Sequence, residues 1–408
     1  MNKLSRLIGF NKHSNEFTVR HLKDSEVGHI PSDWQVGRVK DYFTLGRGRV
    51  ISKPYIRENS GSFPVYSSQS FNNGELGRID TYDFDGSYLT WTTDGAYAGS
   101  VFFREGKFNC TNVCGTCLAK DPSVVNTKFT AYYLDSKAKQ HVSYVGNPKL
   151  MNNIFAEIPI VLPPLHEQKK IVEILSSVES IIYLLEKYLI KYRFLFKAII
   201  HNKFDLELNN SNFYRLKEIV DPHRPISYGV VQTGENISGG VPCVRVIDMN
   251  KFPMNTFSMI KTSIAISNKY QKTILKEGDL MVALRGRIGH TCLVPKHLSG
   301  SNLTRGIALI SSSKNFDSDY VRYAMKSNLV SKQIQDATNG SALQEIPLKN
   351  LREIKIPLPE IEHQVKLANE LKVIENLIEK TDKKKQQMYL LKQAVSADLL
   401  SGRKRVSV

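Results

Sequence analysis

Residues 158–175 read IPIVLPPLHEQKKIVEIL, and residues 354–371 read IKIPLPEIEHQVKLANEL. Placing Pro163 on Pro359, 196 positions later, also places Gln168 on Gln364. The match continues without a gap as far as Ala198 and Ala394. An internal repeat of this length indicates the overall organisation of the chain. The chain is therefore predicted to consist of two halves, each ending in one copy of this stretch.

Each copy has the periodicity of a long helix. Apolar residues recur at alternating steps of four and three, which places them in a narrow seam on one helix face. The prolines suit a helix start, because the first turn needs no N–H donors, and Glu167 complements the helix dipole there. Helices are predicted over 163–205 and 358–402, although the polar run 381–385 interrupts the second seam. The simplest partner for each seam is the other copy.

The sequence between the repeats predicts two globular domains, over 29–162 and 206–357. Both contain short alternating strands separated by Asn-Gly, Asp-Gly and Gly-Gly turns. In each, a helix is expected next (126–139 and 318–336), then a glycine loop (146–149 and 339–341) and then the long helix. A lead-in over 1–28 and a basic tail over 403–408 complete the chain. The expected fold class is α+β, with two mixed domains, two long antiparallel helices resembling a coiled coil, and a pseudo-two-fold repeat.

Composition limits the classes of function. The 408 residues carry a formal net charge of +17, which favours a polyanionic partner such as nucleic acid, without separating DNA from RNA. Apolar runs are too short for a membrane span and the N-terminus has no signal core, so a cytoplasmic protein is expected. Five cysteines, an odd number, argue against a disulfide framework.

Several basic residues are candidates for DNA contact. Glycines in the stretch 284–290 allow close backbone approach, and its two arginines could grip phosphate or guanine. An equally simple interpretation is a bulged turn with solvated arginines, and the stretch 45–49 is similarly ambiguous. The candidates are Arg47, Arg49, Lys149, Arg245, Arg285, Arg287 and Arg305. In the repeat, Pro163, Gln168, Pro359 and Gln364 are candidates for subunit contact or for fixing the helix start, with capping as the alternative.

Catalytic and metal sites are not predicted. Cys110, Cys114 and Cys117 have a spacing that could hold an iron–sulfur cluster of a radical S-adenosylmethionine enzyme. The alternative is three small residues on a half-buried strand, because the sequence lacks the strand–helix alternation of such enzymes. Phosphate-loop, methyltransferase, metalloprotease and hydrolase motifs are also missing from the sequence. A chain that reads a polyanion without chemistry of its own is favoured, and a coiled-coil scaffold with incidental charge stays as a further hypothesis.

The chain resembles the specificity subunit of type I restriction–modification systems. The resemblance covers about residues 28–402 and rests mainly on LPPLHEQ at 162–168 with KIV at 170–172, and on LPEIEHQ at 358–364. Further similar phrases are GHIPSDW (28–34), YGVVQTG (228–234), GGVP (239–242), GDLMVALRG (278–286) and SNLTRG (301–306). Glu360 departs from the pattern, where proline is more usual.

The resemblance implies two target-recognition domains held apart by an antiparallel pair of long helices, each domain reading half of a split, asymmetric DNA sequence. It further implies that two modification subunits dock on the helices, bring S-adenosylmethionine and flip an adenine out for N6 methylation. Restriction subunits would add translocation and cleavage driven by ATP, with Mg²⁺. No cofactor and no catalytic residue is expected in this chain itself.

Overall fold

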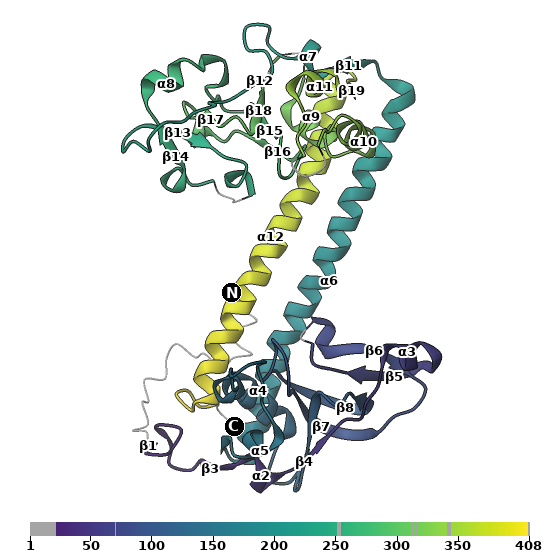
Figure 1. The fold of residues 1–408 in the computed structure, drawn as a ribbon, viewed down its shortest axis with the longest axis vertical. Helices are drawn as coiled ribbons and strands as arrows, with labels where there is room; N and C mark the ends of the chain where they lie inside the picture. Colours follow the sequence, from purple (N-terminus) through teal and green to yellow (C-terminus); the bar gives the residue numbers. More distant parts are fainter. Residues whose placement is uncertain are drawn as a thin grey trace. The chain divides into compact units, whose positions relative to one another are not determined.

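The computed structural model describes residues 22–69, 71–250, 254–311, 313–314, 316–340 and 344–406. Most of the predicted lead-in, residues 1–21, lies outside the described residues, and so do parts of the 339–341 loop and of the basic tail. The chain forms two compact units (Figure 1), which are treated separately below. The first unit consists of residues 1–185 and 384–408, and the second of residues 186–383.

The first unit contains a six-stranded sheet in the order β4-β9-β7-β8-β5-β6. All neighbouring strands are antiparallel except β5 and β8. The strands are β4 (Phe43–Arg47), β5 (Ser60–Tyr66), β6 (Glu75–Ile79), β7 (Phe84–Thr92), β8 (Val101–Cys110) and β9 (Cys114–Ala119). The helices of this domain are α2 (Val39–Tyr42), α3 (Lys53–Glu58), α4 (Thr127–Lys137) and α5 (Asn152–Ala156). Its main core joins the sheet residue Trp91 to α4 and to both long helices, through Leu175 and Leu399.

The second unit has smaller sheets. One is four-stranded, in the order β12-β18-β15-β16, and one is three-stranded, in the order β14-β13-β17. These strands are β12 (Ser227–Tyr228), β13 (Val241–Val244), β14 (Ile260–Thr262), β15 (Leu280–Ala283), β16 (Thr291–Leu293), β17 (Asn302–Leu303) and β18 (Ile307–Ile310). The helices are α7 (Leu216–Ile219), α8 (Ile264–Asn268), α9 (Ser318–Ala324), α10 (Asn328–Asp336) and α11 (Leu348–Glu353). The two domains therefore carry different sheets.

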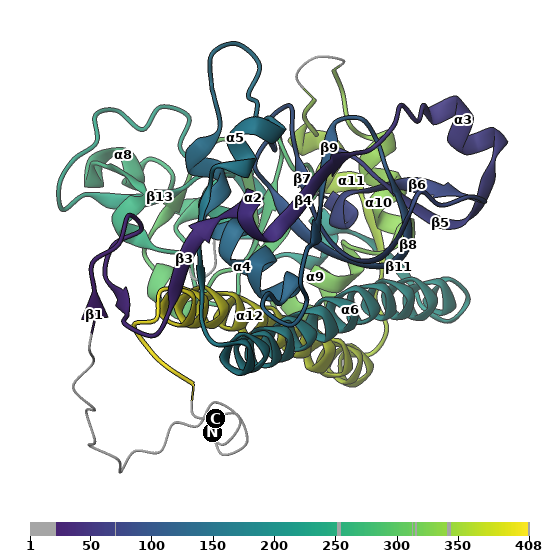
Figure 2. The same cartoon turned by 90° about the horizontal axis from the view of Figure 1, so that it is seen from below.

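A short two-stranded ladder ties each domain to its long helix. In the first unit β3 (Gln35–Arg38) pairs with β10 (Pro159–Leu162), and in the second β11 (Phe213–Arg215) pairs with β19 (Lys355–Pro357). In Figure 2, β3, α2 and β4 follow one another along the chain. An equivalent ion pair lies next to each ladder in the chain, from Lys40 to Glu157 and from Lys217 to Glu353, each at 2.6 Å. β1 (Leu22–Lys23) pairs with β2 (Ile30–Pro31) ahead of the first ladder.

The two predicted long helices are present and antiparallel. α6 spans Leu165–Asn210 and α12 spans Ile361–Leu400. In the first unit Val178 and Ile182 of α6 pack on Met388 of α12, whereas Leu175, earlier in α6, shares a core with Leu399. In the second unit the ion pairs Arg193–Asp382 and Lys203–Glu370 show the same opposed direction. The expected fold class is confirmed.

As predicted, α12 continues through the polar run 381–385, where the Thr381 hydroxyl donates to the Leu377 carbonyl at 2.7 Å. Two local expectations differ from the structure. The single helix expected over 318–336 is two helices, α9 and α10, because the Ser327 hydroxyl accepts the Val330 N–H and starts a new one. α4 also ends at Lys137, followed by a 3₁₀ turn over Ala138–His141.

The repeated glutamine fixes the start of α6 on the first domain. Gln168 is buried, and its Nε2 donates to the Pro163 carbonyl at 2.8 Å and to the Val124 carbonyl at 3.0 Å. Its Oε1 accepts the backbone N–H of Asn126 at 2.7 Å. Asn126 in turn caps α4 by accepting the Phe129 N–H. The amide thus joins the first turn of the long helix to the first turn of the shorter one.

Gln364 repeats this arrangement in the second domain. It is buried, its Nε2 donates to the Pro359 carbonyl at 2.7 Å, and its Oε1 accepts the N–H of Asp317 at 2.9 Å. Asp317 caps α9 through the Tyr320 N–H. Both amides are occupied within their own domains. The structure therefore favours the helix-start role of Gln168 and Gln364 over a contact with another subunit.

We expect Gln168→Ala and Gln364→Ala each to lower the free energy of unfolding by about 2 kcal/mol, because each leaves buried backbone groups without partners. Urea denaturation of the full chain measures the loss. Gln387→Ala, at an exposed position of α12, is the matched control and should change stability by less than about 0.5 kcal/mol. Wild-type midpoints for both buried variants would contradict the role.

Candidate nucleic-acid interface

Part of the positive charge is neutralised within the fold. Arg405 of the basic tail binds Asp33 and Glu167, each through an N···O contact of 2.7 Å, and Arg403 and Lys404 pair with Asp398. The indole N–H of Trp34 donates to the same Glu167 at 3.1 Å. The described part of the tail therefore holds the end of α12 on the first domain.

The basic candidates of the first domain lie near the end of β4. Arg47 is exposed, and its guanidinium donates to the Thr93 hydroxyl at 3.0 Å. Lys149 is exposed, and its backbone pairs with that of Asp94, next to Thr93. Arg49 is also exposed but is paired with Asp83 at 2.9 Å. The structure thus brings Arg47 and Lys149 to one side of the turn that follows β7, with Arg49 two residues beyond β4.

A closed loop over 143–149 lies next to Arg47 and the turn after β7. Ser143 and Lys149 exchange two backbone hydrogen bonds of 2.9 Å each, which close the loop. In the second domain Asn339 and Glu345, each 196 positions later, exchange the same pair at 2.9 and 3.0 Å. The tip of the first loop carries exposed Tyr144 and Val145, which the sequence interpretation passed over in favour of the neighbouring charges.

Three basic candidates of the second domain, Arg245, Arg285 and Arg305, lie near Val246 and Gly306. A Cβ added at Gly306 would lie 3.2 Å from Val246 and 3.3 Å from Arg285 Nε. Arg245 directly precedes Val246 in the chain, and Arg305 directly precedes Gly306. The backbone of Arg285 pairs with that of Glu345, at the end of the 339–345 loop. These positions therefore lie together at one end of the strands.

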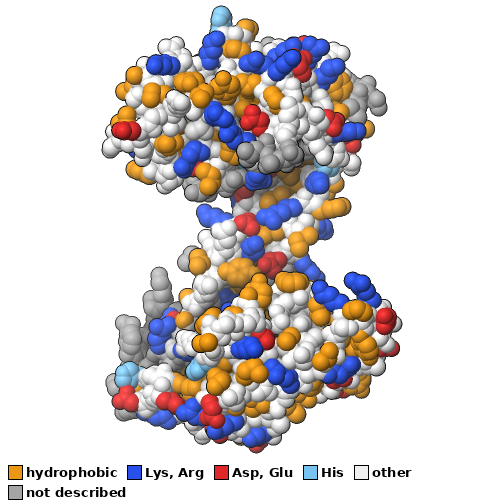
Figure 3. Space-filling model, in the orientation of Figure 1, with side chains coloured by type: hydrophobic (Ala, Val, Ile, Leu, Met, Phe, Trp, Pro, Cys, Tyr) orange, Lys and Arg blue, Asp and Glu red, His pale blue; other side chains and the backbone are white. Residues whose placement is uncertain are grey.

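The four arginines of the second domain differ in their surroundings. Arg245 is held by Asp248 through two hydrogen bonds of 2.9 Å, which raises its pKa. Arg285 is half-buried, and its Nε has no hydrogen-bond partner among the described residues. Arg287 and Arg305 are exposed. Over both units, Lys and Arg side chains are scattered among hydrophobic and acidic ones on the face visible in Figure 3. Arg285 differs from the other three in that its unpartnered Nε is a buried atom.

The cysteine hypothesis is contradicted by the strand geometry. Cys114 and Cys117 lie three residues apart on β9, so their side chains point to opposite faces of the sheet. Cys110 and Cys114 belong to one hydrophobic cluster and Cys117 to another, where burial raises the pKa of its thiol. Among the described residues no group of three or more His, Cys, Asp or Glu side chains could hold a metal ion. The radical-enzyme hypothesis is wrong, because the three thiols cannot bind one cluster.

The described helices include none that is long and apolar enough to cross a membrane.

The prolines of the repeat lie at the starts of the long helices, where the Pro163 and Pro359 carbonyls accept from the two glutamines.

Comparison with known proteins agrees with the repeat. The family model for the type I restriction modification DNA specificity domain matches residues 31–191 and again residues 207–388. A putative type I specificity subunit of Mycoplasma pneumoniae, S.MpnORF507P, is 32% identical over 339 residues, covering 81% of this chain and 86% of that protein.

Two solved structures share the fold. The type I restriction–modification S subunit from M. genitalium has a TM-score of 0.64 at 17% identity, covering 90% of this chain and 96% of that one. A chain from a structural study of complex assembly and conformational transition in the type I system has a TM-score of 0.55 at 14% identity, covering 92% and 99%. The twofold match to the family model and the relative that matches over 81% of this chain show that it belongs to the type I restriction–modification DNA specificity family.

Proposed function

We propose that this chain is the sequence-reading subunit of a type I restriction–modification complex, in which each domain contacts one half of a bipartite, asymmetric DNA site. The observation that carries the proposal is a repeated framework bearing two different sheets. The hydrogen bonds of Gln168 and Gln364, the two-stranded ladders and the loops closed by paired backbone hydrogen bonds recur in both domains. The strand orders of the larger sheets do not recur. A shared framework with different reading surfaces suits a site whose two halves differ in sequence.

Each domain offers the two kinds of contact that DNA reading requires. Exposed basic side chains neutralise phosphates and fix the orientation, and a few side chains at base edges provide specificity. In the first domain Arg47 and Lys149 would contact the phosphates. In the second domain the half-buried Arg285 suits a bidentate contact to guanine through the terminal nitrogens of its guanidinium, and the exposed Arg287 and Arg305 suit phosphates.

The catalytic steps belong to partner subunits in this proposal. Two modification subunits would dock on the helices, bind S-adenosylmethionine and methylate a flipped adenine at N6. Restriction subunits would use ATP and Mg²⁺ for translocation and cleavage, and the assembly would work in the cytoplasm. Large apolar side chains on the exposed surface of α6 support docking there, since Ile190 is 70% and Phe194 76% exposed.

The proposal is tested by mapping methylated adenines in a genome with and without this chain. We expect adenines within a two-part sequence to lose methylation when the chain is removed, because its domains select the site. Unchanged methylation at every two-part sequence would contradict the proposal.

We further expect Arg285→Ala or Arg287→Ala to weaken DNA binding about tenfold through one half-site only, since both residues belong to the second domain. Binding of the assembled complex to duplexes with either half-site mutated measures the effect. Arg47→Ala is the matched variant and should act on the other half-site. Equal losses at both half-sites, or no loss, would refute the assignment.

A further inference from the structure

The most exposed large apolar residue in the described part of the first domain is Val145, at the tip of the 143–149 loop. Val145 is 92% exposed and Tyr144 beside it is 70% exposed. Neither side chain contributes to the hydrophobic clusters of the fold. Two adjacent apolar side chains presented to solvent are unfavourable for an isolated protein and are typical of a binding surface.

The loop that carries these side chains is held firmly. Besides the two hydrogen bonds between Ser143 and Lys149, the Pro148 carbonyl accepts the Gly95 N–H at 3.0 Å. The Asn147 side chain donates to the Asp94 carboxylate. These hydrogen bonds attach the ends of the loop to the turn after β7. Because the loop is already ordered, it loses little conformational entropy when a partner binds.

The surroundings of the tip favour an anionic partner. Lys149 closes the loop and is exposed, and Arg47 reaches the neighbouring Thr93. The Asp94 carboxylate at the base of the loop already accepts from Asn147. Tyr97, on the same turn as Asp94, adds a second half-exposed aromatic ring. An apolar tip flanked by basic side chains has the composition of a wedge that enters a nucleic-acid groove.

We infer that Tyr144 and Val145 form a wedge that enters the DNA at the half-site of the first domain and separates neighbouring bases. This inference rests on the proposed function and adds to it a distortion of the duplex. The Tyr144 ring would stack on an exposed base face, while Val145 would fill the opened step. Arg47 and Lys149 would hold the flanking phosphates. Because unstacking is easiest at flexible steps such as TA and CA, the wedge would add sequence preference without a hydrogen bond to any base.

The test uses the full chain assembled with its methyltransferase subunits and a duplex carrying the sequence found by methylation mapping. 2-Aminopurine replaces in turn those adenines in and beside the two half-sites that are neither methylated nor adjacent to the methylated adenine, because its fluorescence rises on unstacking and flipping of the methylated adenine would raise it as well. We expect a rise at one step in the half-site of the first domain with the wild-type chain. The double variant Tyr144→Ser/Val145→Ser should at least halve that rise and weaken binding about tenfold.

Phe257→Ser is the matched control, because Phe257 is similarly exposed but belongs to the second domain. It should leave the fluorescence in the first half-site unchanged. Thermal unfolding of each variant confirms that the fold is kept, which is expected since the substituted side chains lie outside the cores.

The outcomes separate the wedge from the proposed function. If the wild-type chain directs methylation of a two-part sequence but raises no fluorescence in that half-site, or if the double variant behaves as wild type, the wedge alone is overturned. If the double variant instead loses subunit assembly while binding DNA normally, the tip is a protein contact and the wedge is again overturned. If the wild-type chain directs no methylation of a two-part sequence, the proposed function fails and the wedge with it.

Discussion

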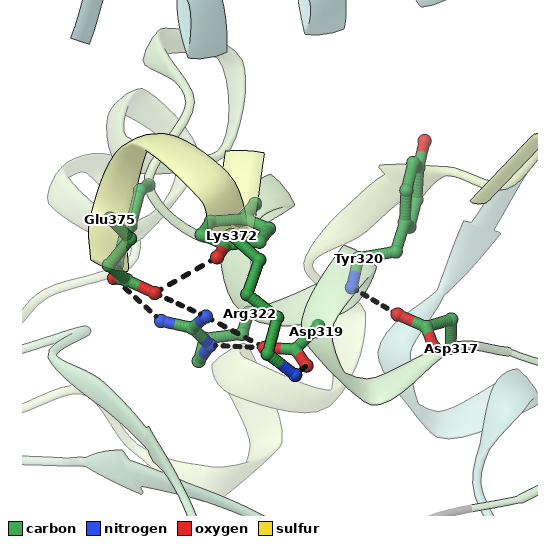
Figure 4. A network of polar contacts seen from close by, with 8 residues as sticks. Asp317, Asp319, Tyr320, Arg322, Lys372 and Glu375 are labelled. Atoms are coloured by element: carbon green, nitrogen blue, oxygen red, sulfur yellow. Dashed lines mark hydrogen bonds and ion pairs between the residues drawn. The ribbon is translucent and has the colours of Figure 1, made fainter. Parts of the chain in front are cut away.

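Glu375→Gln is expected to lower the free energy of unfolding of the second unit by about 3 kcal/mol. The Glu375 carboxylate on α12 accepts from Arg322 at 2.6 and 2.9 Å (Figure 4). It also accepts from the Tyr323 hydroxyl at 2.9 Å and from Lys326 at 3.1 Å. Arg322 also binds Asp319 at 2.7 Å. Removing the Glu375 charge takes away the carboxylate that the partly buried Arg322 and Lys326 share, while Asp319 still binds Arg322. Urea denaturation, with hydrogen exchange in α9, measures the loss.

The pH dependence of this effect follows from the pKa of Glu375. Burial alone would raise that pKa, but the hydrogen bonds and charges of Arg322 and Lys326 overcome the penalty and lower it to about 2. A carboxyl whose pKa is depressed in the fold stabilises the fold above its unfolded value of about 4.5. The difference between wild type and Glu375→Gln should therefore be complete at neutral pH and shrink as the pH falls from about 4.5 towards 2. A difference that does not change with pH would contradict the charge network as its cause.

Glu179→Gln is the matched control in the first unit. Glu179 stands 196 positions before Glu375 and accepts from the Tyr132 hydroxyl and from Lys392 at 2.7 Å. Its side chain and that of Lys392 are each about a third exposed. Solvent screening of this single pair limits the expected loss to about 1 kcal/mol. Equal losses at the two positions would show that the extra cations of the second unit contribute nothing.

The repeat was predictable where the spacing between its copies is constant. The seam of alternating four and three residues indicated both long helices and their antiparallel pairing, because each copy needs an apolar partner. The predicted end of α6, at 205, is too early; Phe204, just before it, packs on Tyr320, with ring centroids 5.2 Å apart. The helix reaches Asn210.

The paired tyrosines escaped prediction because the separation changes within the domains. Tyr132 and Tyr323 bind the repeated glutamates from equivalent positions, six residues after the capping Asn126 and Asp317. They are 191 positions apart, whereas the glutamates are 196 apart, so a comparison without gaps cannot align both pairs. The repeat therefore extends into domains whose sequences do not resemble each other.

The candidate DNA contacts were predictable as basic residues but not as a surface. Arg49 is neutralised by Asp83, 34 residues away, and only the fold of the sheet brings the two together. The partner of Arg245, Asp248, is close in sequence and could have been noticed. Tyr144 and Val145 lacked any sequence signal of exposure, because adjacent apolar residues are usually buried.

Trp91→Ala is expected to cost about 4 kcal/mol of stability in the first unit and to impair the half-site of the first domain selectively. Trp91 is fully buried on β7, and its ring stacks on Phe155 with centroids 3.9 Å apart. Its indole N–H donates to the Leu150 carbonyl at 3.0 Å. Leu150 directly follows the 143–149 loop, so the same ring that fills the core also anchors the loop. Denaturation and half-site binding of the assembled complex measure the two effects.

Trp91→Phe separates the two contributions. Phenylalanine keeps a ring against Phe155 but cannot donate to Leu150, so we expect a loss of about 1–2 kcal/mol. Tyr320→Phe is the matched control, because it removes one buried hydrogen bond, to the Pro357 carbonyl at 3.0 Å, in the second domain. If anchoring of the loop matters for DNA, Trp91→Phe should weaken binding through the first half-site while Tyr320→Phe leaves that half-site unchanged. Equal stability losses with no difference between the half-sites would show that Trp91 supports the core alone.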